Sequence, residues 1–289
     1  MEEAHLQSPE ETIKTQQEKM DILEQKLNET EQKLNQLKQN LDQKVIERTV
    51  EVNRLLKHIT KFIDSLSHDL GTPLTPLITL LPIVKQQIQD PKMIEMIDTC
   101  IRNAEYIKRV VINARKLAEV NATDLLLRKE NLNSLFQEIL SKYEVVFKSC
   151  NIQIQNNISN EVFIKTDKIR LIEVFDQILS NAVNSMLDGG KLTFNSKNVQ
   201  KEKGKFIQIS IVDTGTGLTR DETDRIFDEF YKVDAARHKL DSTGLGLPIC
   251  KAIIEKHGGK IWADSHGKGT GTTIHFTLPS PEIVYTRSF

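Results

Sequence analysis

The stretch SHDLGTPLTP, from Ser67 to Pro76, places a histidine beside a carboxylate and two prolines within a segment of helical character. Proline removes a backbone donor and kinks a helix, so Pro73 and Pro76 predict a bent helix here that continues beyond them. His68 is followed directly by Asp69. A carboxylate bonded to one imidazole nitrogen fixes the tautomer and raises the nucleophilicity of the other nitrogen. His68 is therefore a candidate nucleophile.

Upstream of this stretch, apolar residues repeat every seven positions. A sustained heptad repeat predicts a coiled coil. After Leu41 the frame shifts by four residues to Val45, and such a stutter locally unwinds a supercoil. The stutter is either an accident of packing or a point where rotation of the coil is transmitted, and the sequence leaves both open. The seam residues are Ile13, Met20, Leu23, Leu27, Leu34, Leu37 and Leu41, then Val45, Val52, Leu55, Ile59, Phe62 and Leu66.

Downstream, apolar residues step by four and three along two segments that are separated by the turn candidate Gln89-Asp90-Pro91. Two helices joined by a short turn form an antiparallel hairpin. Each apolar stripe is too wide to be covered by a single neighbour. We therefore predict a homodimer, in which two hairpins form a four-helix bundle.

The composition of the 289 residues excludes several classes of protein. With 39 Lys and Arg against 40 Asp and Glu, the net charge of −1 gives no support to bulk electrostatic binding of nucleic acid. Cys100, Cys150 and Cys250 are odd in number and have no metal-ligand spacing, which disfavours a disulfide scaffold and a zinc site. The chain has no apolar run of about twenty residues, and its first residues, MEEAHLQSPEE, lack the apolar core that a signal peptide would have. We expect a cytoplasmic protein with no membrane insertion in this chain.

The C-terminal half mixes helical and strand patterns, which predicts an α+β domain with a single mixed sheet and helices on one face. The expected helices are 132–150, 167–187 and 245–256, and the expected strands are 152–155, 162–165, 192–196, 206–212, 261–264 and 272–278. The predicted division of the chain is a coiled-coil signalling helix (1–58), a helical hairpin (59–120), a linker (121–130), a C-terminal domain (131–280) and a tail (281–289).

Three glycine motifs and one asparagine in this half are candidates for binding chemistry. DTGTG (213–217) closes an apolar run, STGLGL (242–247) precedes a helix, and GKGTGTT (267–273) opens the last strand. The N-terminus of a helix after a glycine loop is suited to bind phosphate, although each motif alone is also a simple turn. Asn181 lies in an apolar helix, where its amide either caps a neighbouring loop or binds Mg²⁺ through its oxygen.

Taken together and in this order, these motifs and the FDEF of residues 227–230 resemble a sensor histidine kinase. Its parts would be a dimerisation and histidine-phosphotransfer domain of the HisKA type, followed by an ATP-binding α/β sandwich of the GHKL type. The resemblance covers roughly Ile59 to Pro279 and leaves out the N-terminal coil.

The resemblance implies ATP and Mg²⁺ as ligands and roles for individual residues. His68 would take the γ-phosphoryl group and pass it to an aspartate of a response regulator receiver domain. Asp69 would orient His68, and Thr72 would position water when the partner is dephosphorylated. Asn181 would bind Mg²⁺, and Asp213 would bind the adenine amino group. The segment 231–242 would be a mobile lid. The other nucleotide-binding residues would be Gly215, Gly217, Phe230, Lys232, Arg237, Thr243, Gly244, Leu245, Gly246 and Thr272.

Three positions depart from the family pattern, namely Gly71, Gln177 and Asn184. Hydrolytic ATPases of the same superfamily carry a glutamate as general base where this chain has Gln177, and an amide cannot take that proton. Transfer to histidine is therefore favoured over hydrolysis. The second alternative is a coiled-coil dimer that acts as a signalling scaffold without phosphoryl transfer.

Overall fold

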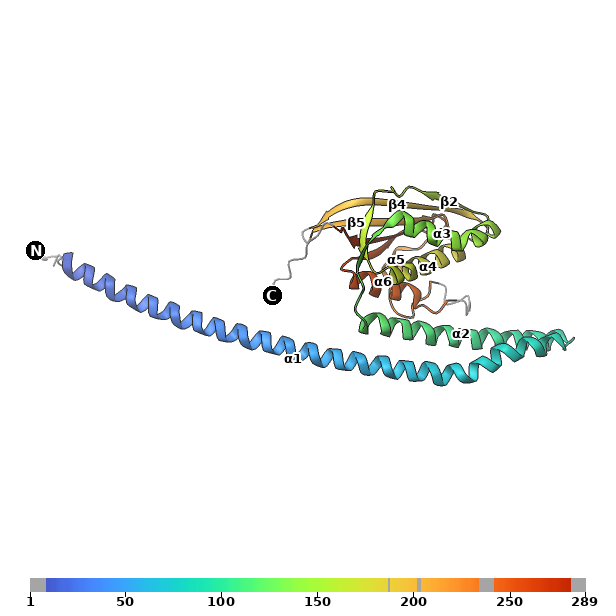
Figure 1. Ribbon diagram of the computed structural model, residues 1–289, viewed down its shortest axis with the longest axis horizontal. Coiled ribbons are helices and arrows are strands. Elements are labelled where there is room, and N and C mark those ends of the chain that lie inside the picture. The colour runs from blue at the N-terminus through green and yellow to red at the C-terminus, as the bar shows by residue number, and fades with distance from the viewer. Residues whose placement is uncertain (1–8, 187, 202–203, 234–241, 282–289) are drawn as a thin grey trace, which may run out of the picture. The chain divides into compact units, whose positions relative to one another are not determined.

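The computed structural model describes residues 9–186, 188–201, 204–233 and 242–281 (Figure 1). The chain forms two compact units, Met1–Leu55 and Leu56–Phe289. The predicted five-part division of the chain is finer than this and stays a prediction. No described helix combines the length and the apolar character that a membrane span requires.

The described part of the first unit is the N-terminal portion of α1, a helix that runs from Pro9 to Gln86. Every side chain from residue 23 to residue 55 is exposed, including those of Leu27, Leu34 and Leu41. Apolar side chains repeated along one face of a helix and left in water are unfavourable, so this face calls for a covering partner.

The second unit begins with a helical hairpin formed by residues 56–86 of α1 and by α2 (Pro91–Ala122). Asp90 caps α2 by accepting a hydrogen bond from the Lys92 N–H at 3.0 Å. Ion pairs between Lys85 and Asp98 (2.7 Å) and between Arg115 and Asp64 (2.9 Å) join the antiparallel helices. As predicted, α1 continues through its prolines, and Figure 1 shows a bend in its last third.

The C-terminal domain has a five-stranded mixed sheet with the strand order β2-β4-β5-β7-β6. The β2–β4 pair is parallel, and the other pairs are antiparallel. Three helices, α3 (Leu132–Ser149), α4 (Lys168–Ser185) and α6 (Gly246–Lys256), lie on one face of this sheet (Figure 1). The strands are β2 (Ile152–Asn156), β4 (Gly190–Lys201), β5 (Gly204–Asp213), β6 (Ile261–Asp264) and β7 (Thr272–Pro279).

An aromatic cluster joins these helices to the sheet. Phe136 of α3 lies 4.0 Å from Phe194 of β4 and 5.6 Å from Phe175 of α4, measured between ring centroids, and Phe175 lies 5.7 Å from Phe276 of β7. Such fully buried aromatic pairs dominate the energetics of a core. By burying Phe175 and its helical neighbours, the cluster fixes which face of α4 remains free to build a site.

The prediction of a single sheet is wrong, because β3 (Phe163–Thr166) pairs with β1 (Arg128–Asn131) in a separate antiparallel sheet. The strand β1 has the sequence RKEN, without apolar alternation. Its backbone hydrogen bonds to β3, and not the burial of its side chains, therefore hold it in place. Residues 121–130, predicted as a linker, contain the end of α2 and the start of β1. The short helix α5 (Arg220–Arg225) was also not predicted, although a capping box of Thr219 and Glu222 marks its start.

Candidate functional site

Asp213 stands at the end of β5, where the sequence predicts a carboxylate followed by a tight turn. Its side chain is almost buried, at 8% exposure. The Oδ1 atom accepts hydrogen bonds from the Gly215 N–H (2.9 Å), the Thr272 N–H (3.2 Å) and the Ser185 hydroxyl (3.5 Å). Burial raises the pKa of Asp213, and these donors counteract the rise. No donor among the described residues reaches Oδ2, so that oxygen can accept a hydrogen bond from a ligand.

The turn after Asp213 brings backbone segments into close contact. Gly217 has a φ of 65°, and a Cβ at this position would collide with the backbone oxygen of Gly267. A Cβ at Gly215 would collide with the Ser185 hydroxyl, which bonds to Asp213. The DTGTG turn and the GKGTG loop therefore pack against each other, and Asp213 joins them through its bond to Thr272.

One face of α4 lines the site with three polar side chains, one per turn. Gln177, Asn181 and Ser185 are spaced by four residues, so they follow each other along the same face. Gln177 Oε1 occupies the place that a Cβ at Gly246 would take, and Ser185 reaches Asp213. Asn181 lies between these two anchors and is exposed. The expectation that its amide is enclosed within the apolar helix is wrong, because Asn181 is exposed at the edge of the buried apolar face that Leu171, Val174, Ile178 and Leu179 form.

The STGLGL segment leads into α6, as its sequence predicts. Leu245 is the N-cap residue and is buried, and no side chain caps the first turn of α6. The first N–H groups of a helix have no intrahelical partner and attract anions. The loop itself is fixed by a hydrogen bond of 2.9 Å from the Phe230 N–H to the Gly244 oxygen, and both residues have positive φ angles. Phe230 therefore acts through its backbone, while its side chain remains exposed.

Two further residues predicted to bind nucleotide are held by side chains of α2. The Thr243 hydroxyl accepts a hydrogen bond from Asn113 Nδ2 at 2.8 Å. The Lys232 ammonium donates to the Tyr106 hydroxyl at 3.3 Å and lies 4.6 Å from the centroid of that ring. No sequence pattern indicates these contacts. Arg237, like most of the predicted lid, lies outside the described residues.

The His68 pair lies on the hairpin, apart from the glycine loops. The side chain of His68 is 84% exposed. Its Nδ1 lies 3.5 Å from Asp69 Oδ1, and the Thr72 hydroxyl donates to the His68 backbone oxygen at 3.0 Å. Among the described residues, no hydrogen bond or ion pair joins His68 to the C-terminal domain.

The residues of the candidate nucleotide site are suited to a metal ion that is bound mainly by the phosphates of the nucleotide. The described residues contain no group of three or more His, Cys, Asp or Glu side chains that could hold a metal ion. Mg²⁺ retains several waters and commonly takes one or two protein oxygens together with substrate phosphates. The exposed amide oxygen of Asn181 is suited to that limited role.

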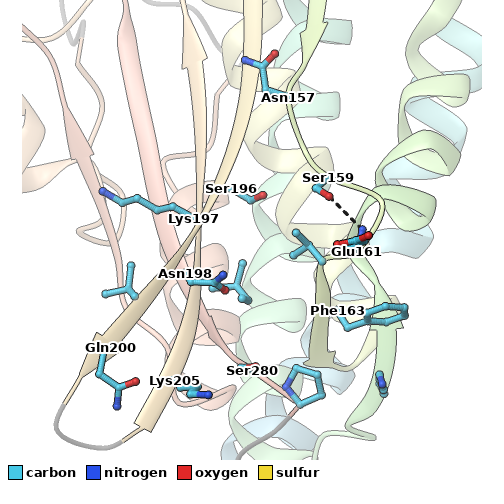
Figure 2. Close-up of a pocket in the computed structure, with 15 residues that line it drawn as sticks. Asn157, Ser159, Glu161, Phe163, Ser196, Lys197, Asn198, Gln200, Lys205 and Ser280 are labelled. Atoms are coloured by element: carbon cyan, nitrogen blue, oxygen red, sulfur yellow. Dashed lines mark hydrogen bonds between the residues drawn. The ribbon is translucent and has the colours of Figure 1, made fainter.

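A cavity of about 810 Å³ lies elsewhere, beside the β4–β5 hairpin and the β2–β3 loop (Figure 2). Polar side chains such as Asn157, Ser159, Asn198 and Gln200 line much of it. It contains none of the predicted site residues. The candidate nucleotide site lies instead at the glycine loops and at the start of α6. Its hydrogen-bonding groups identify it, and a deep cavity does not.

Comparison with known proteins places this geometry in a family. Residues 166–282 match the family described as histidine kinase-, DNA gyrase B-, and HSP90-like ATPase. The sensor histidine kinase WalK of Bacillus subtilis (strain 168) is 32% identical over 243 residues, which make up 82% of this chain and 39% of that protein. The chain therefore spans well under half the length of this relative.

Two solved structures share the fold. Full-length ShkA in complex with AMPPNP has a TM-score of 0.56 at 20% identity, with 77% of this chain and 46% of that chain covered. ThkA in complex with the response regulator protein TrrA has a TM-score of 0.53 at 22% identity, with 78% and 63% covered. Residues 166–282 belong to the histidine kinase-, DNA gyrase B-, and HSP90-like ATPase family, and over 82% of its length the chain is similar to a sensor histidine kinase.

Proposed function

We propose that the chain is an ATP-dependent protein-histidine kinase of a two-component system. The C-terminal domain binds ATP with Mg²⁺, and His68 accepts the γ-phosphoryl group and passes it to an aspartate of a response regulator. The observation that carries the proposal is the exposed His68–Asp69 pair in a chain that also holds the buried Asp213 and the uncapped start of α6.

The His68–Asp69 contact is suited to nucleophilic attack. An Nδ1–H that donates to Asp69 leaves the lone pair of Nε2 free in solvent. Nε2 then bonds to the γ-phosphorus as the bond from that phosphorus to the β–γ bridging oxygen breaks, and ADP leaves. The imidazole becomes positively charged during the attack, and the Asp69 carboxylate stabilises that charge.

Each part of the nucleotide site has a separate role in the proposal. Asp213 accepts a hydrogen bond from the adenine amino group through its free Oδ2, and the first N–H groups of α6 bind phosphate oxygens. Asn181 supplies an oxygen to Mg²⁺, which neutralises phosphate charge when it is bound. Gly215, Gly217, Gly244 and Gly246, together with Thr272 and Leu245, keep the backbone close to the nucleotide.

The assembly in this proposal is a homodimer. The exposed heptad face of α1 is covered by the same face of a second chain in a coiled coil. The hairpins pair in a four-helix bundle, because side chains such as Leu77, Leu80 and Ile107 are about half exposed on a single hairpin. The stutter after Leu41 would pass rotation of the coil to the bundle.

The opposing activity, hydrolytic dephosphorylation of the response regulator, is assigned to Thr72. This residue follows His68 by one helical turn, so both side chains project from one face of the hairpin. Replacing Thr72 with Ala should spare the labelling of His68 and impair dephosphorylation of the partner. Equal loss of both activities would count against this role.

The kinase proposal is tested by incubation of the full chain with γ-labelled ATP and Mg²⁺. We expect label on the protein that is stable in alkali and lost in acid, as a phosphoramidate is. His68→Gln should remove it. His58→Gln is the matched control, since His58 is an exposed histidine of the same helix, and it should keep the label. A folded, nucleotide-binding chain that takes no label would refute the proposal.

A further inference from the structure

We propose that the outer edge of β4 is a docking site for an extended, acidic segment of a partner protein, which adds to the five-stranded sheet as a further strand. The segment would occupy the cavity beside the β4–β5 hairpin (Figure 2). This cavity contains none of the residues of the nucleotide site. The inference therefore goes beyond the proposed function and is independent of it.

The second half of β4 is paired on one side only. β4 pairs with β5 from Leu192 to Lys201. On its other side it pairs with β2 only from Gly190 to Phe194, because β2 ends at Asn156. Among the described strands, none pairs with this side of β4 from residue 195 onward. An unpaired sheet edge is a template on which a further strand can form.

The alternation along β4 determines which backbone groups face this open edge. The Asn157 N–H donates to the Phe194 oxygen at 2.9 Å, so the backbone groups of Phe194 point away from β5. In an antiparallel pair this direction alternates from one residue to the next. The N–H and C=O groups of Ser196 and Asn198 therefore also point to the open edge. Within the part of the chain that the structure describes, no hydrogen bond reaches them.

The cavity of about 810 Å³ lies along this edge. Its lining includes the five consecutive residues 196–200 of β4. Side chains alternate between the two faces of a strand, so a consecutive run lines a cavity with its edge and not with one face. The opposite wall contains Ser159 and Glu161 of the β2–β3 loop and Phe163 at the start of β3 (Figure 2). The volume is typical of sites that bind ligands.

The charges along the cavity indicate an acidic occupant. Lys129, Lys197 and Lys205 line it, and among the described lining residues Glu161 alone is acidic. Such a surface attracts a segment that carries carboxylates. A second copy of this edge is a poorer occupant, because residues 195–201 include lysines and no acidic residue. Like charges on paired strands repel. In strand addition the backbone hydrogen bonds provide affinity, and the side chains provide specificity.

Binding is measured by fluorescence anisotropy with the full chain and a labelled octapeptide in which Glu and Val alternate. We expect saturable binding that weakens as salt is added, because salt screens exposed charges. An octapeptide with Lys in place of each Glu is the charge control. It should show no saturable binding.

The backbone contact is tested at Asn198, whose N–H points to the open edge. Asn198→Pro removes this N–H, and proline is tolerated where a strand N–H has no partner in the sheet. We expect about tenfold weaker binding of the Glu peptide, because a backbone hydrogen bond is lost. Asn198→Ala is the matched control. It keeps the N–H and removes the amide side chain, so its affinity should stay within about twofold of the wild type.

A second probe leaves the protein unchanged. Two versions of the Glu peptide carry backbone N-methyl groups, one on the Glu residues and the other on the Val residues. The N–H groups of a strand alternate between its two edges, so only one set can face β4. One methylated peptide should lose binding, and the other should keep it.

The outcomes separate strand addition from other kinds of binding. Loss of binding in Asn198→Pro and with one methylated peptide supports the proposal. No saturable binding of the Glu peptide would overturn it. Equal affinity of the wild type and a folded Asn198→Pro would do the same, as would equal effects of the two methylations. Association of chains that Asn198→Pro abolishes, without peptide binding, would assign the edge to a second copy and overturn the acidic partner.

Two points keep the test decisive. If Asn198→Pro fails to fold, the methylated peptides decide alone. Failure of strand addition leaves the kinase proposal standing, because the labelling of His68 is a separate measurement.

Discussion

His68 and Asp213, the two residues at the centre of the proposed reaction, lie in opposite environments. The His68 side chain is 84% exposed on a helix, and among the described residues it is paired only with its sequence neighbour Asp69. Asp213 is 8% exposed and is held by three donors, two of them from distant segments. A nucleophile that must reach a separate domain and then a partner protein benefits from exposure. A group that recognises a ligand benefits from being fixed in advance.

The glycines of the two regions differ in the same way. A Cβ added at Gly71 in α1 would meet no atom within 4 Å. A Cβ added at Gly217 would meet the backbone of the neighbouring loop. Within the single chain there is therefore room for a methyl group at Gly71, near the proposed nucleophile, and none at Gly217, near the proposed ligand site. The following changes test this contrast.

The largest effect is expected at Asn181, the exposed residue of the otherwise tightly built site. Asn181→Ala should lower the rate of labelling from γ-labelled ATP by about 100-fold, because an oriented oxygen for Mg²⁺ is lost. Dimerisation, measured by light scattering, should persist. Asn184→Ala changes another exposed amide of α4 and serves as control. Full labelling of the Asn181 variant would remove this residue from the site.

The next effect concerns the tight turn after Asp213. Gly217→Ala should lower the free energy of unfolding by about 1–3 kcal/mol, because alanine is strained at positive φ. It also collides with Gly267. Gly269→Ala separates these causes, since Gly269 has a φ of 82° and open space around it, and it should cost less. Denaturant titrations measure the free energy of unfolding of both variants. An equal decrease in the two would show that the collision with Gly267 contributes nothing to the effect of Gly217→Ala.

In the hairpin the same type of substitution should have the opposite sign. Gly71→Ala should raise stability by about 0.5–1 kcal/mol, because alanine restricts the unfolded chain and favours a helix. The open space around Gly71 gives the new methyl group nothing to displace. Thermal melting followed by circular dichroism checks this prediction. A fall in the melting temperature would mean that a contact outside the single chain, such as the bundle, requires glycine here.

The smallest effect is a pH dependence of the ATPase domain. His257 is buried, its Nδ1–H donates to the Ile253 oxygen at 2.7 Å, and its Nε2 accepts from the Asp167 N–H at 3.0 Å. Burial lowers the pKa of His257, so the unfolded chain takes up a proton at a higher pH than the folded chain does. Its contribution to stability is present above the unfolded pKa of about 6.5 and is lost as the pH falls below that value.

Denaturant titrations at about pH 7.5 and about pH 5.5 check this prediction, because most carboxylates remain charged over that range. The free energy of unfolding should be lower at the acidic value. His257→Gln should weaken the dependence, and His266→Gln, at an exposed histidine, should leave it unchanged. A dependence that is the same in both variants would assign the effect to other groups.

Periodicity predicted most elements of the fold within a few residues. The helix expected over 132–150 is α3 (Leu132–Ser149), and the strand expected over 261–264 is β6. The polar strand β1 and the second half of β4, residues 197–201, were missed because backbone hydrogen bonds to neighbouring strands hold them. Apolar alternation, the signal on which the prediction depended, is absent there.

The parts of the candidate site that a local sequence motif marks were predicted. The contacts that depend on how distant helices pack were missed. Glycine motifs at strand ends and helix starts placed Asp213 and the start of α6 correctly. The contacts of Thr243 and Lys232 with α2 depend on which helix face meets the ATPase domain. Residues such as Asn113 and Tyr106 carry no local pattern that reveals such a partner.

The kinase proposal is tested most directly by locating the transferred phosphoryl group. The full chain, incubated with γ-labelled ATP and Mg²⁺, is digested at neutral pH, and the labelled peptide is sequenced by mass spectrometry. We predict a single phosphorylated residue, His68, and labelling of the same peptide about 100-fold more slowly in Asn181→Ala. Label on another residue, or release of all labelled phosphate into solution with His68 unmodified, would contradict it.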